Sequence, residues 1–316
     1  MDLSVVIPCY NEEESLGETY RRVKAACEAA PVESYEIIFV NDGSTDKTLL
    51  ILKTLVEADS RLVAIDLSRN HGQQLALTAG LFQAKGNYTL IIDADMQDPP
   101  ELLSAMLERA RDGVDVVYGQ RTTREGETWV KLTTSRLFYK LLSFLSETPI
   151  PRDVGDFRLI SRRVLDHFKK MPEHHRFVRG MIAWVGFRQE AMPYDRDARF
   201  AGTTKYSLLK LLHLSLDAIS SFSIRPLRIS MLFALFGAVL AGCLGLFAVW
   251  AYYNHRTISG WASLATIITF FSSLQLICIG MIGEYIGRTY IEVKNRPLYM
   301  IREIYPTEKA NPGTGS

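Results

Sequence analysis

Short apolar runs alternate with segments of helical periodicity through the first third of the chain. The apolar runs end in polar turns and predict strands at Leu3–Pro8, Glu36–Val40, Leu62–Leu67 and Leu90–Ile92. The segments between them repeat apolar residues with a helical period and predict helices over Glu13–Ala30, Lys47–Ala58 and 73–84. Strands that alternate with helices, without hairpin turns between them, indicate an α/β fold with a mostly parallel sheet.

Two much longer apolar runs follow toward the C-terminus. Ile229–Tyr253 and Trp261–Gly283 contain no charged residue. Each is long enough to cross a hydrocarbon core of about 30 Å at about 1.5 Å per residue. We therefore expect a C-terminal two-helix transmembrane hairpin within 229–287. This divides the chain into an N-terminal domain (1–205), an amphipathic juxtamembrane helix (206–228), the hairpin and a C-terminal tail (288–316). The juxtamembrane helix either lies in the membrane interface or packs on the N-terminal domain.

Basic residues around the two apolar runs predict their orientation. Arg225 and Arg228 precede the first run, and the second is followed by Arg288, Lys294, Arg296 and Arg302. The short connection Asn254–Gly260 carries only Arg256. The positive-inside rule then places the N-terminal domain and both termini in the cytoplasm. The chain opens directly into a strand, so we expect no signal peptide.

Composition narrows the class of protein further. The 316 residues are 47% hydrophobic with a formal net charge of +1, which indicates neither disorder nor a nucleic-acid partner. The mean hydropathy of +0.04 is high for a soluble enzyme, and the excess lies in the two long apolar runs. The four cysteines show neither metal spacing nor a disulfide framework, which fits a reducing compartment for residues 1–228.

Side chains with metal-binding chemistry follow the strand Leu90–Ile92. Asp93 and Asp95 are one residue apart, and Gln97 continues the series. Residues i and i+2 of an extended segment share a face, so we expect these three side chains to point at one centre. Their oxygens suit Mg²⁺ or Mn²⁺, which take one or two carboxylates and complete their shell with substrate phosphates. Asp98 is expected to cap a helix that starts at Pro99. The alternative is an acidic turn without a metal.

The turns after the first two strands carry candidate nucleotide-binding groups at the same edge of the sheet. Asp42 is placed to accept a hydrogen bond from the N3–H of a uracil, and Tyr10 to pack on the ring. Asp-Gly-Ser is also ordinary turn chemistry, so both interpretations stay open. The chain has no Gly-x-Gly-x-x-Gly and no Gly-Lys-Ser/Thr phosphate loop, which argues against a dehydrogenase and an ATPase.

Four segments, in their order along the chain, resemble the motifs of family 2 glycosyltransferases. They are Val5–Glu12, Asn41–Asp46, Asp93–Pro100 and Gly155–Arg158. Within that family the similarity is to the polyprenyl-phosphate sugar transferases, which include bactoprenol glucosyltransferases and dolichyl-phosphate mannose synthases. It covers nearly the whole chain, including both apolar runs and Gly283–Arg288 after them. The Gln-x-x-Arg-Trp motif of processive polysaccharide synthases is absent, which favours a single transfer.

The resemblance implies a glycosyltransferase A-type nucleotide-diphospho-sugar-binding fold and an inverting, metal-dependent transfer. By motif match it assigns donor binding to Pro8, Tyr10, Glu12, Asp42 and Asp93, and the Mg²⁺ or Mn²⁺ ion to Asp93, Asp95 and Gln97. Asp156 is the residue that matches the family's general base. We expect it mainly to orient the acceptor, through Arg158 or a neighbouring cation, because a phosphate monoester with a second pKa of about 6 is already mostly dianionic near pH 7.

Basic residues in the second half of the domain fit an acceptor phosphate. Arg121 and Arg124 follow the predicted strand Val114–Gly119, and the predicted helix Trp129–Phe144 carries Lys131 and Ser135. Lys205 belongs to 200–206, a segment similar to the family's mobile acceptor loop. A phosphate favours several cations and a hydroxyl. The alternative is a solvated basic surface. Arg121 joins Asp95 and Asp156 as the candidate catalytic residues.

The resemblance implies transfer of one sugar to undecaprenyl phosphate at a bacterial inner membrane, with the catalytic domain in the cytoplasm. Glucose from UDP-glucose is the expected donor, while N-acetylhexosamines, mannose and a modified arabinose remain open. A homo-oligomer also remains open. The rival classes are a non-catalytic lipid-binding subunit, against which the intact Asp93, Asp95 and Gln97 argue, and a transporter, for which the uncharged spans offer no polar path.

Overall fold

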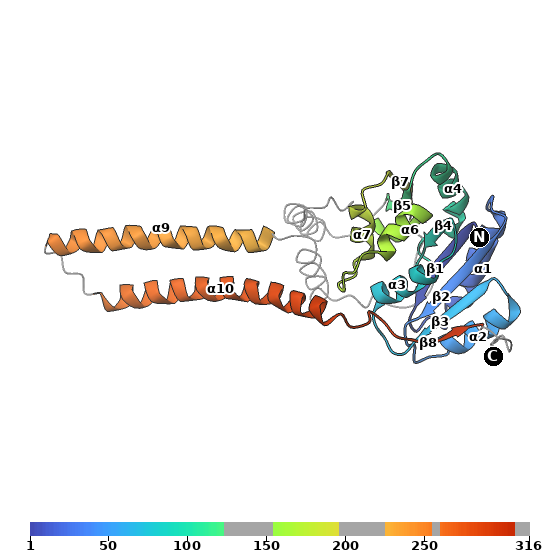
Figure 1. Ribbon diagram of the computed structural model, residues 1–316, viewed down its shortest axis with the longest axis horizontal. Helices are drawn as coiled ribbons and strands as arrows, with labels where there is room; N and C mark the ends of the chain where they lie inside the picture. The colour runs from blue at the N-terminus through green and yellow to red at the C-terminus, as the bar shows by residue number, and fades with distance from the viewer. Residues whose placement is uncertain (123–153, 196–224, 255–259, 307–316) are drawn as a thin grey trace, which may run out of the picture. The chain divides into compact units, whose positions relative to one another are not determined.

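The computed structural model describes residues 1–122, 154–195, 225–254 and 260–306 (Figure 1). The chain divides into two compact units, and each is described by itself. The first contains an eight-stranded sheet with its helices, and it includes the C-terminal residues from Pro297 onward. The second contains the two long helices of the C-terminal half.

The sheet of the first unit is mostly parallel, as the sequence predicts. Its strands are β1 (Leu3–Cys9), β2 (Tyr35–Asn41), β3 (Leu62–Leu67), β4 (Tyr88–Ile91), β5 (Val116–Arg121), β6 (Val154–Ser161), β7 (Gln189–Tyr194) and β8 (Ile301–Tyr305). They lie in the order β7-β5-β6-β4-β1-β2-β3-β8. The central strands β4, β1, β2 and β3 are parallel, and so are β5 and β7. Strands β6 and β8 run antiparallel to their neighbours.

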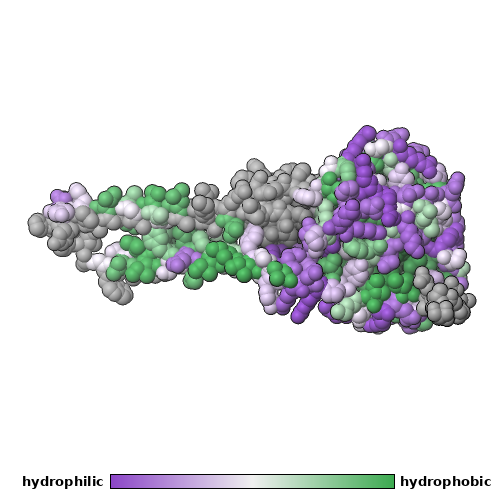
Figure 2. Space-filling model, in the orientation of Figure 1, coloured by the Kyte–Doolittle hydropathy of each residue, from purple (hydrophilic) through white to green (hydrophobic). Residues whose placement is uncertain are grey.

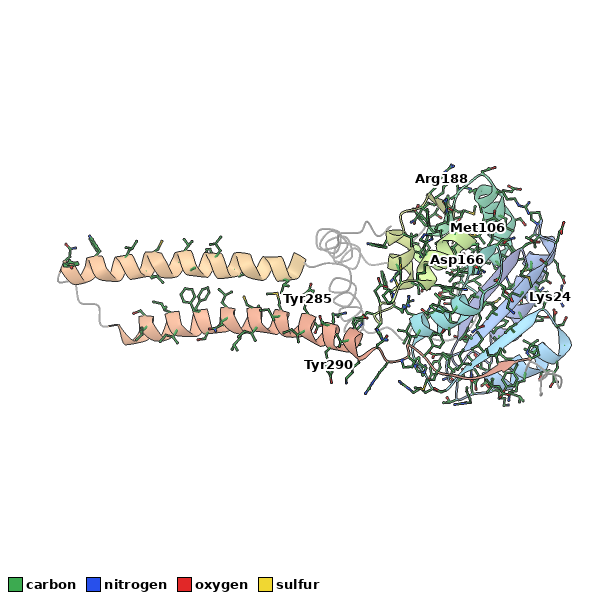
Figure 3. The ribbon with its side chains drawn as sticks, in the orientation of Figure 1. Lys24, Met106, Asp166, Arg188, Tyr285 and Tyr290 are labelled. Carbon is green, nitrogen blue, oxygen red and sulfur yellow. The ribbon has the colours of Figure 1, made fainter. Side chains whose placement is uncertain are left out.

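Helices cover both faces of this sheet, which is why the central strands are continuously apolar. The helices of one face are α1 (Leu16–Ala29), α2 (Thr48–Ala58) and α4 (Leu103–Arg111), and those of the other are α3 (Gln73–Gln83), α6 (Arg162–Lys169) and α7 (Val178–Trp184). Every residue of β1 and β2 is buried, as expected of a parallel sheet between two helical layers. Met106 of α4, labelled in Figure 3, is fully buried within the first layer.

Helix α3 packs unusually close to the two central strands. An ideal Cβ on Gly80 would lie 2.4 Å from Val6 Cγ1 and 2.9 Å from Val40 Cγ2. Only a residue without a side chain allows this approach, because β-branched valines in a packed core have little freedom to move. The close packing fixes the first turn of α3 beside the carboxyl ends of β1 and β2, where the candidate site lies.

The second unit consists of α9 (Arg225–Tyr253) and α10 (Trp261–Lys294), which pack on each other. An ideal Cβ on Gly237 of α9 would lie 3.3 Å from the Phe271 ring of α10. Figure 2 shows mainly apolar residues over the two helices. Within the described residues, one segment, Thr266–Lys294, is long and apolar enough to cross a membrane, and α9 has a shorter apolar stretch at Leu235–Leu244. Of the two predicted spans, therefore, one meets this criterion.

Several boundaries differ from those predicted, with consequences for the site. Strand β4 ends at Ile91 and the chain turns at Ala94 and Asp95, so the segment that follows Asp93 is not extended. Strand β5 extends to Arg121 instead of ending before it. The helix after Asp98 begins with a 3₁₀ turn, η1 (Pro100–Leu102), whose N-cap is Pro99, so the expected capping role of Asp98 is wrong.

Two strands, β7 and β8, were not predicted from the sequence. Strand β7 extends the sheet beyond β5, and β8 pairs with β3 from within the segment predicted only as a tail. The predicted helices Trp129–Phe144 and 206–228 lie outside the described residues.

Candidate active site

The turns after β1 and β2 hold each other through side-chain to backbone hydrogen bonds. The Asn11 N–H donates to Ser44 Oγ at 3.0 Å, and the Thr45 N–H donates to Asn11 Oδ1 at 2.8 Å. The Lys47 N–H donates to Glu13 Oε2 at 3.0 Å. Asn11 adopts a left-handed conformation with φ of 54°, which asparagine tolerates better than most residues. The two turns therefore form one preorganised surface at the carboxyl ends of their strands.

Three predicted donor-binding residues lie on or beside this surface. Tyr10 is 40% exposed at the end of β1, so its ring is accessible for stacking. The Glu12 N–H donates to Thr48 Oγ1 at 2.9 Å, and the Glu12 carboxylate accepts the Ser15 hydroxyl at 2.7 Å. Pro8 is buried within β1 and shapes the strand rather than the exposed surface.

Asp42, the fourth predicted donor residue, is almost fully buried at 3% exposure. Its two carboxylate oxygens accept the backbone N–H groups of His71, at 2.7 Å, and Gly72, at 2.9 Å. Burial raises the pKa of Asp42, and these two hydrogen bonds partly offset the increase. A carboxylate accepts about four hydrogen bonds, so Asp42 retains acceptor capacity while it holds the loop before α3.

Asp93 and Asp156 come together through the antiparallel pairing of β4 with β6. Ile91 is paired with Arg158 at the end of this ladder. Asp93 lies two residues beyond Ile91, just after the end of β4, and Asp156 lies two residues before Arg158 within β6, so this pairing brings the two carboxylates to the same end of the ladder. Accordingly, Asp156 is the carboxylate with the largest effect on Asp93. An antiparallel strand thus delivers a side chain to the carboxyl edge of parallel neighbours.

The first two residues of α3 hold these two carboxylates. Gln73 Nε2 donates to Asp93 Oδ1 at 2.8 Å, and Gln74 Nε2 donates to Asp156 Oδ2 at 3.0 Å. The other side of the Gln74 amide accepts the Val178 N–H at 2.9 Å, at the start of α7. Both the NH2 group and the oxygen of the Gln74 amide are therefore hydrogen-bonded, and this orients the amide toward Asp156. Asp156 Oδ1 is buried without a hydrogen-bond partner.

Arg121 lies next to this cluster and is held by Asp98 and Tyr194. Arg121 Nη2 is 3.7 Å from Asp98 Oδ1, and Arg121 Nε donates to the Tyr194 hydroxyl at 3.3 Å. The Tyr194 hydroxyl in turn donates to Asp98, which is 2% exposed. Burial alone would lower the pKa of Arg121, but Tyr194 and Asp98 raise it overall. A Cβ on Gly155 would lie 2.8 Å from Arg121 Nη2, so the missing side chain leaves room for the guanidinium.

Arg158 does not reach the Asp156 carboxylate, although the sequence suggested a link between them. Its guanidinium donates to the main-chain carbonyls of Gly155, at 2.8 Å, and Asp156, at 3.3 Å. Burial lowers the pKa of Arg158 to about 10, so it remains charged near neutral pH. Arg158 thus braces the backbone that carries Asp156.

Negative charge accumulates at this edge of the sheet. Burial raises the pKa of Asp93 to about 8, and the carboxylates of Asp156, Asp98 and Asp95 add to the increase. Near neutral pH the cluster therefore favours a bound proton at Asp93 or a nearby cation. Arg121 supplies one positive charge to the same region.

The residues of the cluster fit a divalent cation that is shared with a ligand. Among the described residues, no group of three or more His, Cys, Asp and Glu side chains is arranged to hold a metal ion by itself. Mg²⁺ and Mn²⁺ commonly take one or two protein carboxylates and complete their shell with phosphates, so three are not required. The crowded Asp93 and the buried, partnerless Asp156 Oδ1 indicate a deficit of positive charge.

The chain at the predicted metal ligands does not have the extended geometry that the sequence argument assumed. Because the chain turns after Asp93, the alternation of an extended segment does not place Asp95 and Gln97. Instead, Met96 adopts a φ of 64°, and Asp95 Oδ1 accepts the Gln97 N–H at 3.2 Å within the turn. The predicted acceptor residues Arg124, Lys131, Ser135 and Lys205 lie outside the described residues.

Sequence reasoning missed four side chains that organise the site: Gln73, Gln74, Asp98 and Tyr194. For Asp98, the sequence predicted a helix cap, because two prolines follow it, and not its pairing with Arg121 and Tyr194. Gln73 and Gln74 begin a predicted helix, and their position beside Asp93 and Asp156 depends on how α3 crosses the sheet. Strand β7, which carries Tyr194, was not predicted.

Comparison with known proteins places this site in a family. The model described as "Glycosyl transferase family 2" matches residues 4–168. The uncharacterized glycosyltransferase YkcC of Bacillus subtilis is 46% identical over 309 residues, which cover 96% of this chain and 94% of YkcC. The bactoprenol glucosyl transferase of Shigella phage SfII is 39% identical over 316 residues, which cover 99% of this chain and 100% of the phage protein.

Solved structures resemble the chain more distantly. The structure of S. aureus TarS 1–349 in complex with UDP-GlcNAc has a TM-score of 0.49 at 19% identity, and it covers 70% of this chain and 66% of that one. The mannosyltransferase PcManGT from Pyrobaculum calidifontis, in complex with GDP-Man and Mn²⁺, has a TM-score of 0.45 at 17% identity over 88% and 86% of the two chains.

The chain belongs to glycosyltransferase family 2 and is a glycosyltransferase. The mostly parallel sheet agrees with the glycosyltransferase A-like fold that the resemblance implied. Its full-length relatives include both bactoprenol glucosyl transferases and uncharacterized glycosyltransferases.

Gln74 offers a direct test of how the site is organised. Gln74→Ala removes the hydrogen bond that fixes Asp156, and we expect kcat to fall about 10- to 100-fold, the effect of losing about 1.5–3 kcal/mol from a hydrogen bond to a charged group. The measurement is the rate of sugar transfer by purified protein. Gln83→Ala, at the other end of α3, is the matched control and should retain the wild-type rate. Equal rates for the two variants would show that Gln74 does not position Asp156.

Proposed function

We propose that this enzyme transfers one glucose from UDP-glucose to undecaprenyl phosphate, with inversion, on the cytoplasmic side of a bacterial inner membrane. The observation that carries the proposal is the near full-length similarity to proteins named bactoprenol glucosyl transferase, at 38–39% identity. The cluster of Asp93, Asp156 and Arg121 supports it, because it combines groups for a metal-bound diphosphate with a cation for an anionic acceptor.

On the donor side, the joined turns after β1 and β2 bind the nucleotide. Tyr10 is exposed for stacking on the base, and Asp42 has acceptor capacity left for the uracil N3–H. Pro8 shapes the end of β1, and Glu12 holds the turn that follows it. Other donors, namely a UDP-N-acetylhexosamine, GDP-mannose or a UDP-modified arabinose, are the second candidates, because the described residues include none that distinguishes the sugar.

Asp93, Asp95 and Gln97 would hold Mg²⁺ or Mn²⁺ together with the donor diphosphate. A bound divalent ion would stabilise the negative charge that develops on the departing nucleotide diphosphate. Asp93 and Asp95 contribute carboxylates, and the turn at Met96 sets the direction of the second one. Asp98 holds Arg121 instead of contacting the metal.

The acceptor phosphate binds at Arg121, with Arg124, Lys131, Ser135 and Lys205 as further candidates from the sequence. Arg121 is fixed by Asp98 and Tyr194, so its guanidinium is presented in one orientation to a phosphate. Asp156 orients the acceptor and takes a proton only from its monoanion. With that role, the Gln74→Ala variant is slowed by a similar factor at pH 6 and pH 8.5.

The membrane part of the proposal has both apolar helices spanning the bilayer. Thr266–Lys294 has the length and composition of a span, and the uncharged sequence Ile229–Tyr253 of α9 supports a second. Several Arg and Lys residues flank the two helices on the side of the catalytic domain, whereas the connection between the helices contains only Arg256. By the positive-inside rule, this difference supports a cytoplasmic catalytic domain. The lipid phosphate would then reach the site from the inner leaflet.

A panel assay tests the reaction. Purified protein is incubated with undecaprenyl phosphate, Mg²⁺ or Mn²⁺ and each nucleotide sugar, and lipid-linked sugar is measured. We expect transfer from UDP-glucose, and a loss of at least about 100-fold in Asp95→Ala, because the diphosphate loses a charged metal ligand. Glu101→Ala is the control, since Glu101 pairs with Arg22 on the surface, and it should behave like wild type. Full activity of Asp95→Ala, or of wild type in excess chelator, contradicts the metal role.

Thiol labelling tests the orientation. In a background without the four native cysteines, Asn254→Cys and Glu57→Cys are exposed to a membrane-impermeant maleimide in intact spheroplasts. Asn254 follows α9, and Glu57 lies near the end of α2. We expect labelling of Asn254→Cys at once and of Glu57→Cys only after permeabilisation. The opposite pattern would reverse the proposed topology.

A further inference from the structure

We propose that Arg302, on the C-terminal strand β8, is a positioning residue for the active site. It acts through the loop and first turn of α3 at Ser68–Gln74, which we call the 68–74 segment. The effect on donor binding rests on the function proposed above, whereas the structural link between β8 and the 68–74 segment does not.

Four consecutive residues at the end of the 68–74 segment contact site carboxylates. The N–H groups of His71 and Gly72 donate to Asp42, as described. The Gln73 side chain donates to Asp93 and the Gln74 side chain to Asp156. One short stretch of chain therefore sets the position of three carboxylates that lie on three different strands or strand ends. Any displacement of this stretch would therefore change the hydrogen bonds of all three carboxylates.

Strand β8 holds the start of the same segment. The Ser68 N–H donates to the Met300 carbonyl at 2.9 Å, just before β8. Arg302 Nη2 donates to the Ser68 carbonyl at 2.6 Å. Both backbone groups of Ser68 are thus bonded to residues that lie more than two hundred positions later in the chain.

The same guanidinium is also linked to the end of β2, through Asp66 of β3. Arg302 Nη1 donates to Asp66 Oδ2 at 3.1 Å, and Asp66 is 1% exposed at the end of β3. Asp66 Oδ1 accepts Asn41 Nδ2 at 2.7 Å, and Asn41 directly precedes Asp42. Arg302 therefore links both partners of the Asp42 contact, the strand end that carries the carboxylate and the segment that binds it.

Close packing between the two loops makes this link stiff. An ideal Cβ on Gly43 would lie 2.4 Å from the Arg69 carbonyl carbon and 2.6 Å from the Asn70 nitrogen, and Gly43 has a φ of 65°. The turn after β2 therefore rests directly on the backbone of the 68–74 segment. Only residues 295–300 separate β8 from the end of α10, so the chain that follows the apolar helix completes the support of the site.

Hydrogen exchange measured on the full-length protein tests the structural link without any substrate. In Arg302→Ala, we expect peptides that cover the 68–74 segment to exchange roughly five- to tenfold faster, because about 1–1.4 kcal/mol of local stability is lost. Peptides from α4 should keep their wild-type rates. Glu303→Gln, an exposed neighbour on β8, is the matched control and should match wild type throughout.

Steady-state kinetics with UDP-glucose and undecaprenyl phosphate test the effect on the site. We expect Arg302→Ala to raise the donor KM roughly three- to tenfold, a typical magnitude for coupling through a packed network, and to change the acceptor KM less than about twofold. Arg302→Lys should lie between Arg302→Ala and wild type, because an ammonium keeps the pairing with Asp66 but lacks the fork that also reaches Ser68. If Arg302→Ala does not fold, Arg302→Lys carries the same comparison.

The outcomes separate this inference from the proposed function. Unchanged exchange in the 68–74 segment, or a wild-type donor KM in Arg302→Ala, overturns the inference. Equal increases of donor and acceptor KM also overturn it, because they indicate general destabilisation. If wild type transfers no glucose while exchange still responds to Arg302→Ala, the assigned donor fails and the structural link stands.

Discussion

The arrangement of the active site follows from the repulsion among carboxylates at one edge of the sheet. Asp93, Asp95, Asp98 and Asp156 affect one another there, and burial strengthens their interaction. Each carboxylate is stabilised by a hydrogen-bond donor or a cation that the fold supplies. Asp98 is paired with Arg121, Asp95 accepts a backbone N–H, and Asp93 and Asp156 are held by glutamine amides. The negative charge that remains has the sign that a divalent cation would neutralise.

The scaffold behind the cluster explains how it stays assembled against this repulsion. Gly80 lets α3 lie directly on β1 and β2, and the first turn of α3 then reaches the carboxylates with Gln73 and Gln74. Strand β6, antiparallel to β4, brings Asp156 to an edge otherwise formed by parallel strands. The turns after β1 and β2, the carboxylate cluster and the C-terminal strand are thus parts of one hydrogen-bonded structure.

The sequence predicted the parallel core because its strands are continuously apolar and its helices amphipathic, and these patterns are local. The acidic motif at Asp93 and Asp95 is also visible in the sequence, and its role in metal binding stays a prediction. The sequence could not predict that Asp156 lies close to Asp93, because that depends on the register of a strand sixty residues away along the chain. For the same reason the sequence did not predict the contacts of Gln73, Tyr194 and Arg302, since each side chain has a partner distant in sequence.

The dependence of nucleotide binding on a divalent cation tests the central claim most directly. Purified protein is titrated calorimetrically with UDP, with Mn²⁺ present and with excess chelator. The account predicts that Mn²⁺ increases UDP affinity at least about tenfold, which corresponds to about 1.4 kcal/mol, and that Asp95→Ala loses this gain. Equal UDP affinity with and without the metal would contradict the account.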